Sequence, residues 1–338
     1  MRKIWLFLGA LMSLGMLVLF IWRSPQHSVL GSAIVQKETS LSEKTIRYEQ
    51  RTLAQSEVHI LLIPSESRFL VTPALSPHLN TVEEFAQKHR AIAQGEVPKA
   101  IAIINGGFFD PNNQKTTSVV VLQGKLVADP RQNERLINNP NLKPYLAKIL
   151  NRSEFRRYLC GQAIRYDIVL RNAPPPTGCQ LINALGGGPQ LLPELTLEQE
   201  GFVDSANSRD ALGSTQPNAR TAVGITGDGS IVLVMVAQKP KAPKNSGISL
   251  PALADFLKSL GVQKAMNLDG GSSSSLYYNG KSFYGKVDLD GNFIKRPVKS
   301  VLMVQENSTS ETKWPFVMQN GEPYFGQQSQ QQADLTSV

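Results

Sequence analysis

The sequence has little of what several protein classes require. Only two of its 338 residues are cysteine and 18% are charged, which excludes a disulfide-dense miniprotein and wholesale disorder. It has no Walker loop, no dinucleotide-binding glycine pattern in a βαβ unit and no nucleophile elbow. Its histidines, at positions 27, 59, 78 and 89, stand in no metal-ligand spacing to one another or to a cysteine. We therefore expect neither a zinc centre nor a cofactor.

The longest apolar run lies near the N-terminus. Residues 4–22 form an uncharged stretch of 19 residues after Arg2 and Lys3, long enough to span a bilayer as a helix. We expect an uncleaved inner-membrane anchor with its N-terminus in the cytoplasm, because basic residues favour that side. The alternative is a secreted protein whose signal (residues 1–22) is removed by cleavage near residues 31–33. Both predictions export the rest of the chain to the periplasm or the cell surface.

Composition divides the remainder into a spacer, one folded domain and a tail. Residues 23–44 are polar and aperiodic, which is typical of a linker. Residues 306–338 form a C-terminal extension that we expect to be partly disordered. Between them, residues 45–305 carry short apolar runs separated by turn residues, and the chain as a whole has 26 glycines and 21 prolines. We predict a single α+β domain of mixed β-sheets with a few packed helices.

Local signals place several elements of that domain. The capping-box spacing at residues 81–84 predicts a helix that continues to about residue 93. Ser249 can cap a second helix with one apolar face. Turn sequences at 227–229 and 279–280 predict two hairpins.

The two cysteines, Cys160 and Cys179, are close enough in sequence to close a modest loop. In an exported domain such a pair predicts a disulfide, and the alternative is two unpaired buried thiols. Prolines interrupt the pattern of residues 130–176. We therefore expect this stretch to be a peripheral excursion held by the bridge.

Three glycine-rich segments each follow an apolar run, at residues 105–110, 186–189 and 269–275. Glycine permits unusual backbone angles and lets a ligand approach main-chain amides, which can bind anions. Each segment taken alone is better explained as a tight turn. Their repeated position after an apolar run predicts loops that line one pocket.

Two charged residues beside these segments are candidates for chemistry. Asp269 ends an apolar strand and precedes glycines and hydroxyls that could orient a sugar or a phosphate, although an Asx turn is the simpler role. Arg220 offers a planar fork of donors matched to phosphate or carboxylate, and its simpler role is a salt bridge at a strand end. Residues 288–292 imitate a calcium loop, but Lys299 stands where the loop needs glutamate, so we predict a hairpin turn there.

The motifs, taken in order, resemble those of the phosphodiester glycosidase family. The similarity covers about residues 95–305, and the ordered set is specific although each piece alone is not. The resemblance implies an enzyme that hydrolyses sugar-1-phosphodiester bonds, and export suits a substrate of the envelope or exopolysaccharide type. The matching motifs are NGGFF at 105–109, GGGPQLL at 186–192, ARTAVGI at 219–225, the helix start at 247–250, NLDGGSSS at 267–274 and the ending at 298–301.

This resemblance implies roles for individual residues. A phosphate monoester leaves more readily than an alcohol, so one carboxylate with cationic and amide stabilisation of the departing phosphate can suffice. We predict Asp269 as that carboxylate, with Asp110 in reserve. Arg220 and the amides of residues 186–188 are predicted to hold the phosphate, and Asn105 and the serines at 272–274 are predicted to contact sugar hydroxyls. The predicted substrate-binding residues are Gly106, Gly107, Asp110, Gly186, Gly187, Gly188, Gly270, Gly271, Ser272, Ser273 and Ser274.

Two other functions compete with hydrolysis. The same pocket could hold a glycan in polysaccharide assembly without cutting it. Nucleic-acid binding is the weaker alternative: the net charge is +8, but basic residues are scattered without an aromatic and basic stripe. The expected partners are therefore a glycan or sugar phosphate and the membrane, and not nucleic acid.

Overall fold

The computed structural model describes residues 45–92, 100–307, 316–319 and 322–325. The predicted anchor at 4–22, the linker at 23–44 and most of the extension at 306–338 lie outside these residues. Within the described ranges, no helix is long and apolar enough to cross a membrane. The body of the chain consists mainly of strands with a few helices, which confirms the predicted α+β class.

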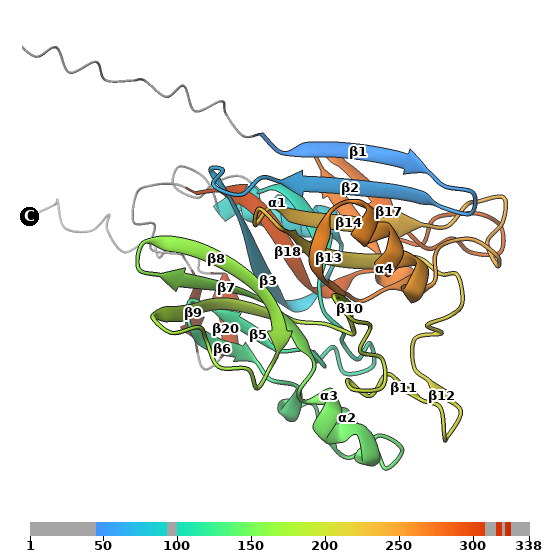
Figure 1. Cartoon of the computed structure of the whole chain (residues 1–338), viewed down its shortest axis with the longest axis horizontal. Coiled ribbons are helices and arrows are strands. Elements are labelled where there is room, and N and C mark those ends of the chain that lie inside the picture. Colours follow the sequence, from blue (N-terminus) through green and yellow to red (C-terminus); the bar gives the residue numbers. More distant parts are fainter. Residues whose placement is uncertain (1–44, 93–99, 308–315, 320–321, 326–338) are drawn as a thin grey trace, which may run out of the picture. The chain divides into compact units, whose positions relative to one another are not determined.

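Three antiparallel sheets make up most of the described domain (Figure 1). The six-stranded sheet runs β1 (Arg47–Thr52), β2 (Glu57–Ile63), β14 (Ile231–Ala237), β13 (Arg220–Thr226), β15 (Val262–Asn267), β10 (Gln190–Leu192). The first five-stranded sheet runs β17 (Lys281–Tyr284), β16 (Ser275–Tyr278), β4 (Ala100–Asn105), β18 (Val298–Glu306), β3 (Phe69–Asn80). The second runs β6 (Lys125–Ala128), β5 (Val120–Leu122), β9 (Cys179–Gly186), β7 (Ser153–Cys160), β8 (Ala163–Leu170). Two short hairpins pair β11 (Val203–Asp204) with β12 (Arg209–Asp210) and β19 (Phe316–Gln319) with β20 (Glu322–Phe325).

The three sheets share one hydrophobic core. Leu233 of β14, Leu302 of β18 and Leu185 of β9 belong to the same buried cluster, although each lies in a different sheet. Successive side chains of a strand point to opposite faces, so each strand contributes alternate residues to this core. The loops at the strand ends are thereby held at fixed positions relative to one another.

Helices cover the outer faces of two sheets. In α1 (Val82–Ile92), Phe85 packs with Ile103 and Met303 of the first five-stranded sheet. The predicted capping box is present, since the Thr81 amide donates to Glu84 Oε2 and the Glu84 amide donates to Thr81 Oγ1.

The second long helix, α4 (Leu250–Ser259), begins at the predicted cap. Ser249 Oγ accepts a hydrogen bond from the Ala252 amide, and Leu253 and Leu257 pack on the outer face of the six-stranded sheet. The remaining α-helices are single turns, α2 (Glu134–Ile137) and α3 (Leu146–Ile149). Three short 3₁₀ turns complete the described helical segments, η1 (Pro130–Gln132), η2 (Lys143–Tyr145) and η3 (Gly271–Ser273).

The stretch expected to be a peripheral excursion, residues 130–176, instead supplies two strands of a core sheet. Strand β7 pairs with both β8 and β9. Its apolar alternation is hidden because Glu154 and Arg156 are buried together on one face, joined by an ion pair of 2.7 Å. A pattern search for apolar residues cannot detect a strand whose covered face is charged.

The predicted disulfide is confirmed. Cys160 and Cys179 are bonded, and they lie directly opposite each other in the register of β7 and β9. The bridge therefore joins two neighbouring strands of one sheet.

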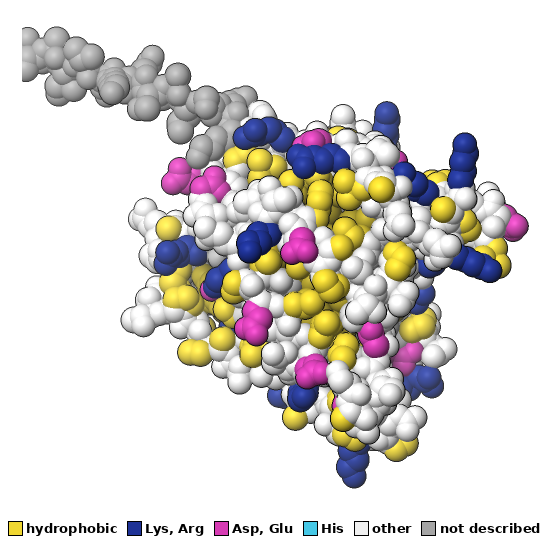
Figure 2. Space-filling model, turned by 45° about the vertical axis from the view of Figure 1, so that its right-hand side comes forward, with side chains coloured by type: hydrophobic (Ala, Val, Ile, Leu, Met, Phe, Trp, Pro, Cys, Tyr) yellow, Lys and Arg dark blue, Asp and Glu magenta, His cyan; other side chains and the backbone are white. Residues whose placement is uncertain are grey.

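Charged side chains of both signs are spread over the face of the molecule seen in Figure 2. On that face Lys and Arg lie singly or in small groups with Asp and Glu between them, and apolar side chains separate them. A continuous basic stripe, of the kind that follows a nucleic-acid backbone, is not seen on this face.

Candidate active site

The predicted glycine segments converge beside the end of β4. The Asp269 amide donates to the Gly106 carbonyl at 3.0 Å, and the Gly188 amide donates to the Asn267 carbonyl at 2.8 Å. The Gly271 amide donates to the Ala219 carbonyl at 2.8 Å. These hydrogen bonds bring loops from all three sheets into contact around Asp269.

Asn105 is the polar centre of this convergence. Its side chain is fully buried, its Nδ2 donates to the Asp269 carbonyl at 2.6 Å, and its Oδ1 accepts from Thr221 Oγ1 at 2.8 Å. The Ser275 amide donates to the same oxygen. Asn105 thus fixes the backbone that carries Asp269, which differs from the predicted contact with sugar hydroxyls.

Gly106 and Gly107 are required by packing. A Cβ on Gly106 would lie 2.8 Å from the Ser300 backbone, and one on Gly107 would lie 2.3 Å from the Gly186 carbonyl oxygen. Distances this short do not occur for real Cβ atoms, so only glycine lets β4 approach β18 and β9 so closely.

The amides of residues 186–188 do not have the predicted role of phosphate ligands in this structure. Each donates to a carbonyl of the protein, on Val119, Ser153 and Asn267 respectively. The backbone of Gly188 has a φ of +104°, and a Cβ there would lie 2.4 Å from Glu200 Oε2. The glycines therefore serve conformation and close packing, and their N–H groups are already paired.

Asp269 is a partly exposed residue whose carboxyl group has a perturbed pKa. Burial raises the pKa of Asp269 from 3.8 to about 6, while a hydrogen bond with Ser273, the Arg296 guanidinium and the Gly270 amide limit the rise. A group that titrates near neutral pH can act as a base or a nucleophile under ordinary conditions.

The three serines predicted to bind sugar have different environments. Ser273 is buried and its side chain hydrogen-bonds Asp269. Ser274 is fully buried, and its Oγ has no hydrogen-bond partner among the described residues. Ser272 is partly exposed and its Oγ accepts from Arg296 Nη1 at 2.8 Å. Of the three serines, only Ser272 is accessible to a ligand, and its hydroxyl also accepts a hydrogen bond from Arg296.

Arg220 adjoins this loop, but its guanidinium faces elsewhere. A Cβ on Gly270 would lie 3.8 Å from Arg220 Cδ, so the two segments are neighbours. The guanidinium donates to four backbone carbonyls, those of Ile248, Leu212, Gly213 and Gln216. Burial lowers its pKa to about 10, and the Asp210 carboxylate opposes that shift. Binding phosphate through this fork would require breaking the carbonyl contacts.

Arg220→Lys is expected to lower the free energy of unfolding by about 2 kcal/mol. The ammonium group of lysine cannot donate to all the carbonyls that the guanidinium reaches, so some of them lose their hydrogen bond. Urea denaturation of the purified chain measures the change. The exposed Arg131→Lys serves as the control and should lie within about 0.5 kcal/mol of the wild type. A normal stability combined with a large rise in KM would mean that Arg220 leaves the carbonyls to bind substrate.

Arg296 is the cation that the sequence prediction missed. It lies near enough to Asp269 to lower the pKa of that carboxyl, and its guanidinium carbon is 5.3 Å from the centroid of the Phe109 ring. Being partly exposed and bound to Ser272 by one nitrogen, it keeps other donors for a ligand. Arg296 lies two residues before β18, and Ser300 of that strand accepts a hydrogen bond from the Gly106 amide. This position beside a predicted motif is the sequence signal that could have revealed it.

A second cation, Lys286, follows the end of β17 and lies near the same loop. Lys286 Nζ donates to Asn218 Oδ1 at 3.1 Å, and a Cβ on Gly271 would lie 3.8 Å from Asn218 Nδ2. Burial lowers the pKa of Lys286, and the nearby Arg220 charge acts in the same direction.

Asp110, the reserve carboxylate, belongs to a surface turn. Its Oδ1 accepts from the Asn112 amide at 2.9 Å and its Oδ2 pairs with Arg135 Nε at 2.8 Å. Desolvation acts to raise the pKa of Asp110, but these hydrogen bonds outweigh it and lower the pKa below its ordinary value. The arrangement is that of an Asx turn.

Among the described residues, no group of three or more His, Cys, Asp or Glu side chains is placed to hold a metal ion. The calcium-like segment forms the predicted turn, since Asp288 Oδ1 accepts from the amides of Asp290 and Asn292.

A family model described as phosphodiester glycosidase matches residues 98–305. No curated protein sequence matches the chain significantly. Among solved structures, the auto-inhibited catalytic domain of zebrafish N-acetylglucosamine-1-phosphodiester alpha-N-acetylglucosaminidase aligns with a TM-score of 0.55 and 19% identity, over 78% of this chain and 82% of that one. This likeness shows a shared fold.

Two bacterial structures are similar at a lower level. A hypothetical protein from Synechocystis gives a TM-score of 0.49 with 18% identity, over 77% of this chain and 62% of that one. A putative exported protein from Burkholderia pseudomallei K96243 gives 0.48 with 17% identity, over 74% of each chain.

Proposed function

This chain belongs to the phosphodiester glycosidase family of hydrolases, and we propose that it cleaves sugar-1-phosphodiesters of envelope or exopolysaccharide-type glycans. The bond from the anomeric carbon to the phosphate oxygen breaks, and water supplies the new hydroxyl group on the sugar. The phosphate departs as a monoester. Family membership supports the reaction class, whereas the sugar and the glycan context are part of the proposal.

The observation that carries this proposal is that the positive charge of Arg296 acts on the Asp269 carboxyl while Arg296 itself is held by Ser272 of the same loop. Ordinary glycosidases need a second carboxyl group to protonate a poor leaving group. A phosphate monoester is already a good leaving group, so a cation that neutralises it can take the place of the acid. Asp269 acts as the nucleophile or as the base for water, and Arg296 holds the phosphate oxygens. Lys286 adds positive charge on the side of Asn218.

This assignment predicts the pH dependence of the enzyme. Asp269 must be ionised to act, so kcat/KM should rise with pH and level off above about 6, where the pKa of its carboxyl lies. The profile is measured by initial rates at subsaturating substrate between pH 4 and pH 8, both values chosen to bracket that pKa. A rate that instead falls above about pH 6 would make the protonated Asp269 a general acid.

The reaction itself is tested with the purified full-length chain and a panel of synthetic sugar-1-phosphodiesters. Release of free sugar together with a phosphomonoester is the expected result. Release of a sugar phosphate would place the cut on the other side of the phosphorus. Binding of the panel without any turnover would favour the competing function, a glycan-binding protein of polysaccharide assembly.

We also propose that the domain works outside the cytoplasm, anchored in the inner membrane by residues 4–22 or secreted after their removal. The Cys160–Cys179 bridge supports an oxidising compartment, because such bonds persist mainly in exported proteins. Fractionation of cells that express the full chain, followed by N-terminal sequencing of the mature protein, distinguishes the anchor from the cleaved signal.

A further inference from the structure

Arg152, which directly precedes β7, is a cation that the proposed mechanism does not use. Its guanidinium carbon lies 3.6 Å from the centroid of the Phe202 ring and 5.9 Å from that of Phe108. Its Nε donates to the Glu200 carbonyl at 3.1 Å. Its two Nη nitrogens make no hydrogen bond or ion pair within the described residues. The flat face is thus covered by aromatic rings while the edge with four N–H donors is unpaired.

The Glu200 carboxylate attracts Arg152 but makes no direct contact with this edge. Both oxygens of buried Glu200 are taken, because they accept from the amide and hydroxyl of Ser153, from the Gln190 amide and from Thr196 Oγ1. Burial lowers the pKa of Arg152 to about 9, the negative charge of Glu200 opposes that shift, and the positive charge of Arg209 adds to it. A desolvated cation of this kind gains from any anion that can reach it.

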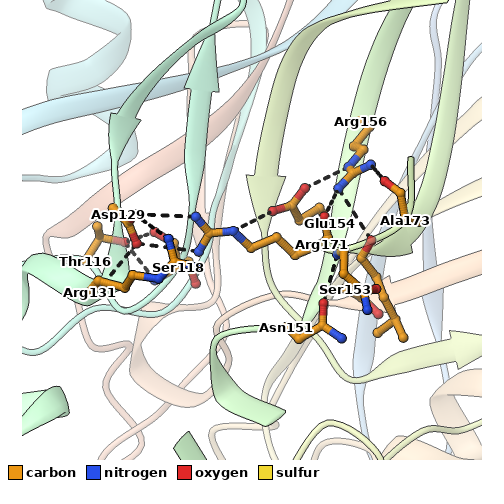
Figure 3. A network of polar contacts seen from close by, with 12 residues as sticks. Thr116, Ser118, Asp129, Arg131, Asn151, Ser153, Glu154, Arg156, Arg171 and Ala173 are labelled. Carbon is orange, nitrogen blue, oxygen red and sulfur yellow. Dashed lines mark hydrogen bonds and ion pairs between the residues drawn. The ribbon is translucent and has the colours of Figure 1, made fainter. Parts of the chain in front are cut away.

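The other charges on this side of the sheet pair among themselves. In Figure 3, Arg171 lies between Asp129 and Glu154, and Glu154 also pairs with Arg156. Arg131 forms a second ion pair with Asp129, at 3.4 Å. These acids therefore pair with arginines other than Arg152, and Arg152 makes no ion pair within the described part of the chain.

Arg152 also lines a small cavity next to the candidate active site. Ser118, Gly186 and Gly187 form other parts of its wall, together with Glu154 and Arg171 of the paired network. Its volume of about 10 Å³ admits a single oxygen atom of an acidic group, whose other atoms stay outside the partly open cavity, and it excludes a sugar ring. Phe108, beside Arg152, directly follows the Gly106-Gly107 segment that contacts Asp269.

The geometry points to Arg152 as an oxyanion-binding subsite next to the active site, where its Nη edge holds a second acidic group, a phosphate or a carboxylate, on the aglycone side of the substrate. The role in substrate selection rests on the proposed function, whereas oxyanion binding by Arg152 does not. The enzyme is then specific for polyanionic glycans, because each such contact is a charge-assisted hydrogen bond to a partly buried guanidinium.

Oxyanion binding is measured first, with inorganic phosphate and the purified full-length chain. The titration uses calorimetry in the Arg296→Gln background, which removes the competing phosphate ligand. Adding Arg152→Gln should weaken phosphate binding at least about ten-fold, and Arg152→Lys should give an intermediate loss because the charge remains without the fork. Arg131→Gln, which removes one charge from the same region, should bind as its background does. Equal binding with and without Arg152 would overturn the proposal.

Substrate selection is measured next, with two diesters that differ only in whether the aglycone carries an additional phosphate. The ratio of kcat/KM for the acidic over the neutral aglycone should fall about ten- to hundred-fold in Arg152→Gln and stay unchanged in Arg131→Gln. An unchanged ratio together with lost phosphate binding would mean that Arg152 binds free phosphate and not the aglycone. If no diester is cleaved by the wild type, the proposed function fails while the phosphate titration still decides the role of Arg152.

Discussion

Asp269→Asn is expected to lower kcat/KM by roughly 10²- to 10⁴-fold, because the amide can neither attack the anomeric carbon nor accept a proton from water. The amide keeps the shape of the side chain and an oxygen that can accept from Ser273 and Gly270, so the loop should keep its conformation. Initial rates of sugar release measure the loss, and binding of a substrate analogue by the variant shows that the site is still formed.

Asp110→Asn is the matched control for this variant. Asp110 lies in a surface turn with Arg135, so its substitution should leave kcat/KM close to that of the wild type. If Asp110→Asn lost the activity and Asp269→Asn kept it, the two carboxylates would have to exchange roles.

The free energy of unfolding of Asp269→Asn shows whether a loss of activity comes from the chemistry or from unfolding. The pKa of Asp269 is higher in the folded state than its ordinary value, so the folded state loses stability as pH rises from about 4 through about 6. The asparagine removes this titration, and the free energy of unfolding at pH 7 should not fall. A marked loss of stability would mean that the lost activity reports unfolding.

Arg296→Gln is expected to lower kcat by about 10²- to 10³-fold, the loss typical when one preorganised donor is removed from a developing negative charge. It should also move the acid limb of the pH profile upward, because the positive charge of Arg296 now holds down the pKa of Asp269. Both effects are obtained from one series of rate measurements across pH.

Lys295→Gln removes the same charge from the neighbouring residue and serves as the control. Lys295 is exposed and pairs with Glu83 at 3.7 Å, and unlike Arg296 it is not among the groups that shift the pKa of Asp269. Its substitution should change neither kcat nor the position of the acid limb. An equal effect of the two substitutions would mean that Arg296 acts only through the general positive potential and not by contact.

Local sequence signals were sufficient for elements whose cause is local. The capping box of Thr81 and Glu84 and the cap at Ser249 are both formed, because each needs only residues of the same helix turn. The Asn279-Gly280 turn joins β16 to β17 as predicted, with both residues at positive φ. The strands within residues 130–176 escape prediction because Glu154 and Arg156 neutralise each other only after the chain has folded.

The sequence by itself indicated the class of fold, the family and the segments that meet at Asp269, and it favoured the disulfide over two free thiols. Only the tertiary structure decided which side chains face that carboxylate. Arg220 is next to the loop in the fold, yet its donors are used by backbone carbonyls, whereas Arg296 arrives from a separate loop and contacts Ser272. The direction of a long flexible side chain depends on acceptors brought near by three sheets packing on one core, and no local spacing of residues encodes that arrangement.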